Sequence, residues 1–352
     1  MILFAVGRDA EKGDAHAVRT SIIARTCLTR GMEVSFLCTD QDVSAYLKAK
    51  GFSCVHETHD RRLLKDTASQ KPSFLVWDTG TPLKAGEVEY LHRHAIPVLE
   101  FDVSDGKSHA DEVVNGFESP LRSATGREYR LVGPDYFVVD KNFCSAREWR
   151  RASSVLQNAL GLFICLGGSD PTALLEPTLE ILTDIPSCRT IQIRVVAEFN
   201  GKDVKELRGK FSAFRNIQIH ASADAVLVAQ LMRFSFLGIV SFGATLAGAL
   251  AAELPVLMIN PTEAHEEQAT RLVRGTFAGV GRTLGCLPHL KWDRVSRELA
   301  ALLDRRREIE RMQAAATGLV DGQGAQRIAR YLFNSVSARR AAAGGLVAIS
   351  AK

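Results

Sequence analysis

The sequence predicts an α/β protein with two domains, each built around a parallel sheet. Short apolar runs alternate with amphipathic stretches along the chain, which is the pattern of repeated β-α-β units. This alternation stops and starts again near residue 148. A chain of 352 residues is also long enough for two hydrophobic cores of ordinary size.

The first domain is predicted over residues 1–147. An apolar run, a stretch with helical spacing that ends in a glycine, and a second apolar run predict a β-α-β unit at its start. Helical or polar stretches separate the later runs, so their strands should extend the same parallel sheet. The predicted strands are ILFAV (2–6), EVSFLCT (33–39), SFLVWD (73–78), IPVLEFD (96–102) and EVVNGF (112–117).

The second domain is predicted over residues 148–335, where a charged helical segment precedes a new series of apolar runs. Small residues dominate the stretch 336–352, which we expect to be a flexible tail. The predicted strands of this domain are GLFICLGG (161–168), TIQIRVVAE (190–198), IQIH (217–220), GIVSF (238–242) and PVLMI (255–259).

Composition argues against several classes of protein. A hydrophobic share of 46% with 24% charged residues is that of an ordinary globular protein, and a net charge of +4 is too small to favour a nucleic acid partner. The 7 cysteines include no CxxC pair, which favours free thiols in a reducing cytoplasm. The first apolar run is too short for a secretory leader, and no run of about 18 apolar residues predicts a transmembrane segment.

A glycine turn links a predicted strand to a predicted helix at residues 166–171 (LGGSDP). Backbone N–H groups at a helix start are unpaired and lie at the positive end of the helix dipole, and glycines let an anion approach them. This turn therefore favours a phosphate as its ligand. The alternative is a purely structural turn in which Ser169 or Asp170 caps the helix.

A second turn of this kind begins at Gly243, between the predicted strand 238–242 and another helix. In open parallel sheets ligands bind at the carboxyl ends of the strands, where both turns should lie. Two such turns in one domain favour a diphosphate. Neither turn matches the GxGxxG pattern of dinucleotide-binding folds or the GxxxxGK pattern of ATP-binding loops, so NAD and ATP lose support as ligands.

His16 lies just ahead of the first predicted helix, in a loop rich in small residues. Such a histidine can act as a general base near neutral pH, and Arg19, one turn away, can contact an anionic leaving group. This interpretation places His16 at the interface of the two domains. The alternative is an exposed loop histidine. The other histidines of the first domain lack cysteines or carboxylates at ligand spacing, so we expect no metal.

Four motifs over residues 1–335 resemble those of one enzyme family. The chain resembles the UDP-sugar hydrolases of pseudaminic acid biosynthesis and their spore-coat-polysaccharide relatives, which are themselves similar to the lipid II N-acetylglucosaminyltransferase. The motifs also occur in the family's order. They are GDAHAVR (13–19) against GxGHxxR, VGPDYFVVDKNF (132–143) against GPxYxxLxxxF, LGGSDP (166–171) against GGSDP, and DGQGAQRIA (321–329) against DGxGAxRI.

This resemblance implies a GT-B-like fold, with two Rossmann-like domains facing each other across a cleft. The first domain would carry the catalytic histidine loop and the second would bind the nucleotide. The implied reaction is hydrolysis of the bond between the anomeric carbon and the diphosphate of a UDP-linked deoxy amino sugar, without a metal or cofactor. Such a step serves nonulosonic acid or surface polysaccharide biosynthesis.

The resemblance also implies roles for individual residues. His16 matches the family's base, which activates water on one face of the anomeric carbon while UDP leaves from the other. The two glycine turns would stabilise the departing diphosphate through backbone N–H groups. The implied substrate contacts are Gly13, Arg19, Asp78, Gly168, Ser169, Gly243, Ala244, Thr245 and Gln268.

The chain departs from the family pattern at several positions. Gly248 stands where the family carries a glutamate for the ribose hydroxyls, and losing such a hydrogen bond costs about 1.5 to 3 kcal/mol. We therefore expect a glutamate at position 248 to improve UDP affinity. Three interpretations stay open: hydrolysis, transfer of the sugar to an acceptor other than water, and nucleotide-sugar binding without catalysis. The other departures are Ala15, Glu267 and the absence of an aromatic residue after Asp78.

Overall fold

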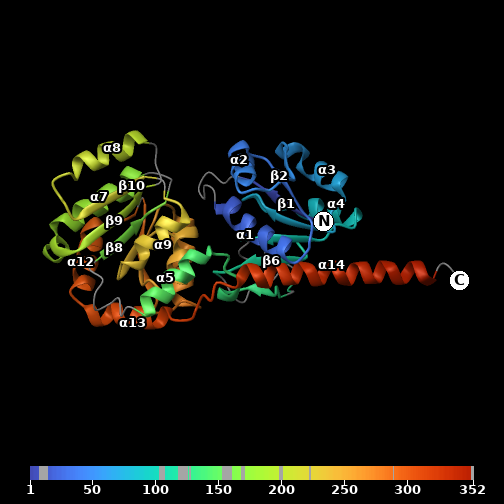
Figure 1. Cartoon of the computed structure of the whole chain (residues 1–352). Coiled ribbons are helices and arrows are strands. Elements are labelled where there is room, and N and C mark those ends of the chain that lie inside the picture. The colour runs from blue at the N-terminus through green and yellow to red at the C-terminus, as the bar shows by residue number, and fades with distance from the viewer. Residues whose placement is uncertain are drawn as a thin grey trace. The chain divides into compact units, whose positions relative to one another are not determined.

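The chain divides into two compact units, which are described one at a time. A computed structural model describes residues 1–7, 15–102, 108–117, 126, 128–152, 161–167, 171–197, 201–221, 223–287 and 289–349. Three of the predicted substrate contacts, Gly13, Gly168 and Ser169, lie outside the described residues. The first unit consists of Met1–Val138 and Gln323–Lys352, and the second of Val139–Gly322 (Figure 1).

The first unit contains a parallel sheet with the strand order β3-β2-β1-β4-β5-β6-β7. The order reverses between β1 and β4, which makes this pair the switch point where ligands bind in open α/β sheets. All five apolar runs predicted as strands contain a strand, whereas β3 and β7 are too short to have been predicted. The bounds are β1 (Ile2–Val6), β2 (Val34–Cys38), β3 (Val55–Glu57), β4 (Phe74–Asp78), β5 (Val98–Phe101), β6 (Glu112–Asn115) and β7 (Leu131–Val132).

Helices cover both faces of this sheet. Successive residues of a strand face opposite sides, so Phe4 of β1 packs in the core formed with α1 and α14, whereas Leu3 and Ala5 pack in the core formed with α3 and α4. Strands buried on both faces are apolar along their whole length, which is why the sequence revealed them as runs. The bounds are α1 (Ala15–Thr29), α2 (Gln41–Ala49), α3 (Asp60–Gln70), α4 (Ala85–Arg93), the 3-10 helix η1 (Pro134–Tyr136) and α14 (Gly324–Ile349).

The second unit contains a parallel sheet with the strand order β10-β9-β8-β11-β12-β13. Its switch point lies between β8 and β11. The apolar runs predicted as strands again contain one strand each, but β13, whose sequence GRTLGC is glycine-rich and half polar, was missed. The bounds are β8 (Gly161–Cys165), β9 (Gln192–Ala197), β10 (Ile217–Ala221), β11 (Leu237–Val240), β12 (Val256–Asn260) and β13 (Gly281–Cys286).

The main core of the second unit lies between its sheet and the helices α7, α8, α12 and α13, which supply Leu179, Val204, Leu299 and Met312. The helix α5 packs against α9 and α10 elsewhere in the unit. The bounds are α5 (Lys141–Ala152), α7 (Pro171–Asp184), η2 (Pro186–Thr190), α8 (Gly201–Lys210), α9 (Ala225–Arg233), α10 (Ala244–Ala251), α11 (Glu263–Arg274), α12 (Trp292–Leu303) and α13 (Arg306–Ala316).

The chain passes between the units at positions 138/139 and 322/323, not at the predicted boundary 147/148. The helix α5 therefore belongs to the second unit as a whole. Arg150 of α5 is 1% exposed, and burial lowers its pKa to about 10 although the charge of Glu253 opposes that change. The local sequence does not reveal that an arginine in a charged helix is buried. The predicted domain boundary therefore fell within α5. The guanidinium of Arg150 donates hydrogen bonds to the backbone carbonyls of Met232, Ser235 and Glu253.

Two glycines of the DGQGA motif lie where the chain returns to the first unit. A side chain on Gly324 would overlap the backbone carbonyl of Phe137. One on Gly322, whose φ is +82°, would overlap the sulfur of Cys144. Close approach of two chain segments therefore explains why this motif requires glycine at both positions.

The stretch 336–352 was predicted to be a flexible tail, and its described part belongs to α14, which continues to Ile349 (Figure 1). Alanine is the strongest helix former, so an alanine-rich stretch extends a helix that packing has already stabilised. That packing comes from Ile328, Ala329 and Leu332, which lie in the core of the first unit. Within the described ranges, no helix combines the length and the apolar character needed to cross a membrane.

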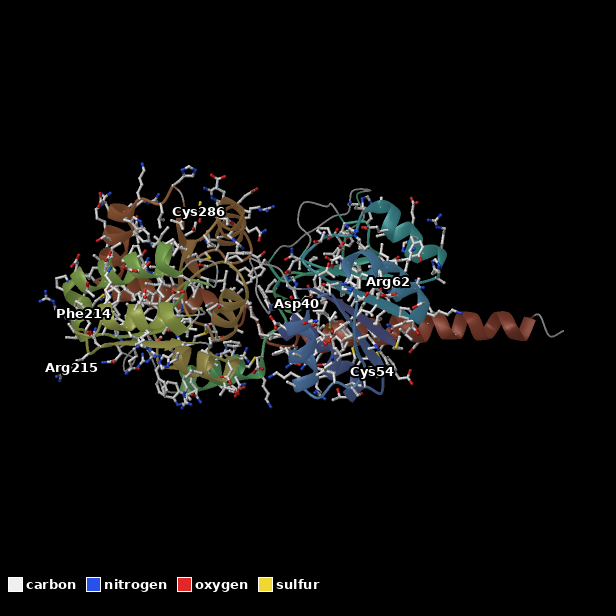
Figure 2. The ribbon with its side chains drawn as sticks, turned by 90° about the horizontal axis from the view of Figure 1, so that it is seen from above. Asp40, Cys54, Arg62, Phe214, Arg215 and Cys286 are labelled. Atoms are coloured by element: carbon white, nitrogen blue, oxygen red, sulfur yellow. The ribbon has the colours of Figure 1, made fainter. Side chains whose placement is uncertain are left out.

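All 7 cysteines are free thiols, as the sequence predicted. Cys54 of the first unit is exposed, whereas Cys286 of the second is buried (Figure 2). Burial raises the pKa of the Cys27 thiol to about 12. Such thiols stay protonated at neutral pH and pack as small apolar residues.

Candidate active site

His16 lies in the first turn of α1 rather than ahead of the helix, and only 1% of the residue is exposed. The alternative of an exposed loop histidine is therefore wrong. Its Nδ1 atom lies 2.5 Å from Oδ1 of Asp78, the last residue of β4. Its Nε2 atom is also buried and has no hydrogen-bond partner among the described residues. An unpaired buried polar atom costs about 1 to 3 kcal/mol, and a position that keeps one calls for an explanation in function.

Arg19, one turn further along α1, contacts the same carboxylate. Its Nε and Nη2 atoms lie 2.6 and 2.5 Å from the two oxygens of Asp78. Its guanidinium also lies over the ring of Phe101, with 4.6 Å between the central carbon and the ring centre. The structure thus brings together three of the predicted site residues, His16, Arg19 and Asp78. Arg19, which was expected to contact a leaving group, contacts the protein's own carboxylates in this structure.

The sequence interpretation missed a fourth member of this group, Asp102. Its Oδ2 atom lies 2.5 Å from Nη1 of Arg19. Asp102 follows β5 as Asp78 ends β4, and these two strands are neighbours in the sheet. The carboxyl ends of adjacent parallel strands meet at one edge, so a second aspartate after the run IPVLEF was the signal that could have found it.

The charges of this group reinforce one another. Burial alone would raise the pKa of Asp78, but the charge and hydrogen bonds of Arg19, with a smaller contribution from His16, hold it below its usual range. Burial alone would likewise lower the pKa of Arg19, but Asp102 and Asp78 raise it. Both groups are therefore ionised at neutral pH, and each stabilises the charge of the other.

A hollow in the surface of the first unit lies beside His16. Glu100, on one of its walls, is buried; its two carboxylate oxygens lie 2.7 Å from the N–H of Leu83 and 2.6 Å from the hydroxyl of Ser108. Burial raises the pKa of this carboxyl, against the effect of those hydrogen bonds. Aromatic rings, hydroxyls and carboxylates on the walls suit a polar ring with an apolar face. Besides His16, the walls include Trp77, Thr79, Thr81, Glu100, Phe101 and Asp102.

In the second unit, the predicted turn at Gly243 starts α10, and the φ of Gly243 is +140°, which favours glycine. The start of α10 leaves backbone N–H groups without intrahelical partners. Neighbouring strands fix the turn, since the hydroxyl of Ser241 donates to the carbonyls of Leu166 and Ile259, at 2.9 and 2.7 Å. Nothing lies within 4 Å of a Cβ added at Gly243, so the approach to the turn is open among the described residues.

The remaining predicted contacts of the second unit lie close to the carboxyl ends of its strands. Ala244 and Thr245 form the first turn of α10, where Oγ1 of Thr245 lies 3.6 Å from the sulfur of Cys165, the last residue of β8. Gln268 lies on α11 and is partly exposed. In the other glycine turn, Gly167 has a φ of +79°.

Sequence comparison finds two relatives, although no protein-family model matches the chain. The spore coat polysaccharide biosynthesis protein SpsG of Bacillus subtilis is 26% identical over 283 residues, which cover 78% of this chain and 80% of SpsG. An uncharacterized protein of Methanocaldococcus jannaschii is 25% identical over 268 residues, which cover 73% of this chain and 55% of that protein.

Structure comparison identifies the fold. MurG of Acinetobacter baumannii matches with a TM-score of 0.69 and 13% identity, over 95% of this chain and 99% of MurG. The UDP-GlcNAc 2-epimerase of Neisseria meningitidis, solved with UDP-GlcNAc bound, matches with a TM-score of 0.60 and 12% identity, over 95% and 100% of the two chains. The chain is similar to SpsG over most of its length and has a GT-B fold. This confirms the predicted fold class and the resemblance stated from the motifs.

Gly248 of α10 is buried against α5. A Cβ added there would lie 2.8 Å from ring atoms of Phe143, the last residue of the VGPDYFVVDKNF motif. The ring of Phe143 thus lies where a side chain at position 248 would begin. The packing argues against the expectation that a glutamate at this position improves UDP affinity.

Replacing Gly248 with Glu should lower the free energy of unfolding by about 2 kcal/mol or more, because the side chain must displace an aromatic ring and bury a carboxylate. Thermal unfolding followed by circular dichroism measures the loss. Gly86→Glu is the matched control, since Gly86 is exposed on α4 with nothing within 4 Å of an added Cβ. A Gly248→Glu variant with wild-type stability and tighter UDP binding would contradict this prediction.

Proposed function

We propose that the chain is a nucleotide-sugar hydrolase that releases UDP from a UDP-linked deoxy amino sugar, in nonulosonic (pseudaminic) acid or surface polysaccharide biosynthesis. One observation carries the proposal: His16 is buried, is held at Nδ1 by Asp78, and has an Nε2 atom without a partner among the described residues, on a wall of a hollow. The name of SpsG as a polysaccharide biosynthesis protein and the UDP-GlcNAc bound to the Neisseria epimerase support it.

In the proposed reaction, Nε2 of His16 accepts a proton from water while the water oxygen forms a bond to the anomeric carbon. The bond between that carbon and the diphosphate oxygen breaks, and UDP leaves with the electron pair. Backbone N–H groups at the start of α10, at Ala244 and Thr245, suit the negative charge that grows on a departing diphosphate. Arg19 and Asp78 hold the base in this scheme and do not contact the substrate.

The test is release of nucleotide from a panel of sugar donors in water enriched in oxygen-18. We expect UDP to be released from a UDP-linked deoxy amino sugar, with the heavy oxygen on the sugar, because water attacks the anomeric carbon. CMP- and GDP-linked sugars should react at least tenfold more slowly, because cytosine and guanine present other donors and acceptors than uracil and one lost hydrogen bond changes affinity by about that factor. Heavy oxygen on UDP would contradict the proposed bond cleavage.

Transfer of the sugar to an acceptor requires the same leaving group and differs only in the nucleophile. Adding sugar, lipid and protein acceptors to the same assay separates the two reactions. Release of UDP that depends on an acceptor, with formation of a glycoside, would replace the hydrolase by a glycosyltransferase. Thermal stabilisation by UDP without turnover of any donor would leave only a binding protein.

A further inference from the structure

We propose that Asp78, Arg19 and Asp102 are positioning residues that fix the proton of His16 on Nδ1 and leave Nε2 as a hydrogen-bond acceptor beside the hollow. The inference rests on the proposed function in so far as it assigns a use to that acceptor. It differs from the sequence expectation, in which Arg19 and Asp78 contact the substrate. These contacts join residues from three places in the fold: α1, the end of β4 and the position directly after β5.

The place of the proton follows from the acceptors around Nδ1. Oδ1 of Asp78 lies 2.5 Å from Nδ1, and an ionised carboxylate can only accept. Two acceptors at that distance would repel each other, so Nδ1 carries the hydrogen. Nη2 of Arg19 lies further away, at 3.1 Å, and also contacts Oδ1 of Asp78 at 2.5 Å. In a neutral imidazole, Nε2 then has the free lone pair.

Arg19 fixes the direction of the carboxylate. It contacts both oxygens of Asp78 through two nitrogens, a planar fork that a lysine cannot reproduce. Phe101 covers the guanidinium at 4.6 Å and so restricts its movement. The carboxylate of Asp78 therefore cannot rotate without losing charge-assisted hydrogen bonds.

Asp102 is the last residue in this series of contacts, and its backbone conformation is unusual. Its φ is +54°, in the left-handed region that non-glycine residues seldom adopt. Its own N–H donates to the carbonyl of Val114 at 3.0 Å, which fixes this turn after β5. The conformation delivers the Asp102 carboxylate to Nη1 of Arg19 at 2.5 Å. Strained backbone is common where side chains are positioned for function.

Nitrogen-15 NMR of histidine-labelled protein tests the inference without any enzyme assay. We expect the His16 signals, identified by their loss in His16→Asn, to show a protonated Nδ1 and an unprotonated Nε2 in the wild type above neutral pH. Asp78→Asn should move the proton to Nε2, because the amide group of the new side chain can donate to Nδ1. Wild-type protein with its proton on Nε2, or an unchanged pattern in a folded Asp78→Asn variant, would overturn the inference.

Turnover of a donor gives the second measurement. Asp78→Asn should lower kcat by about 10² to 10⁴ with KM changed by less than about threefold, the pattern expected when a base is in the wrong tautomer. Arg19→Gln should also lower kcat, and Arg19→Lys, which keeps the charge, should recover part of the loss. Wild-type kcat in both Arg19 variants would contradict a positioning role, and this result answers the question even if Asp78→Asn fails to fold.

Arg25→Gln is the matched control, because Arg25 lies on the same helix and contacts Phe52 and the carbonyl of Lys50, away from His16. It should leave both the NMR pattern and kcat unchanged. The two proposals fail separately. If the protein shows the expected NMR pattern but hydrolyses no donor, the hydrolase proposal alone is refuted. If the enzyme is active but Asp78→Asn leaves the NMR pattern of His16 unchanged, the positioning role alone is refuted.

Discussion

Replacing His16 with Asn should lower turnover of the nucleotide sugar by about 10² to 10⁴ while leaving nucleotide affinity within about threefold, because a general base acts in the transition state and adds little to ground-state binding. Steady-state kinetics measure the first quantity, and isothermal titration with UDP the second. Asn is the suitable replacement because its side chain can still contact Asp78 but is a poor proton acceptor.

His59→Asn is the matched control for this variant. His59 is exposed at the start of α3, where its side chain makes no capping hydrogen bond, and Asn is a favoured residue at such a position. Turnover should therefore stay at the wild-type value. If His16→Asn and His59→Asn were equally active, the assignment of His16 as the base would be wrong.

Replacing Gly324 with Ala should destabilise the protein by about 3 kcal/mol, because an added Cβ would overlap the backbone of Phe137 and backbone cannot move aside as a side chain can. The melting temperature should fall by roughly 6 to 12 °C for a unit of this size. Differential scanning calorimetry measures the change.

Gly209→Ala provides the comparison, since Gly209 is exposed on α8 with nothing within 4 Å of an added Cβ. This substitution should be neutral or stabilising by up to about 1 kcal/mol, as expected for alanine in place of glycine at an open helix position. If the Gly324→Ala and Gly209→Ala variants had the same melting temperature, the DGQGA motif would not be required for close packing of the chain.

The fold could be predicted because strands buried on both faces leave continuous apolar runs in the sequence. The strands β1, β4 and β8 could be predicted without knowing which strands pair with them. By contrast, β3 and β13 contain polar or glycine residues and are strands because a neighbouring strand pairs with them, which the local sequence does not record. Prediction failed for the same reason at Arg150, whose burial depends on carbonyls of other elements.

The position of the candidate site could be predicted from the sequence, but the contacts between its side chains could not. His16 follows from a histidine near a helix start, and Asp78 from the resemblance to the hydrolase family. The sequence gives no means to tell whether such residues contact a ligand or one another. The structure shows that they contact one another, with 2.5 Å from Nδ1 of His16 to Oδ1 of Asp78 and 2.5 Å from Nη1 of Arg19 to Oδ2 of Asp102. To predict Asp102 as a member of the site, one would have needed to know that β4 pairs with β5.

The arrangement of the chain in the two units also sets an order of events during synthesis. The second unit is one continuous segment, whereas the first is split and completed by α14. A ribosome releases the chain from its N-terminus, so the second unit has all of its residues in solution before the first has its last helix. Until then, the core of the first unit has only the helices that precede α14 in the chain, and the apolar residues that receive Ile328 and Leu332 lack the cover of α14.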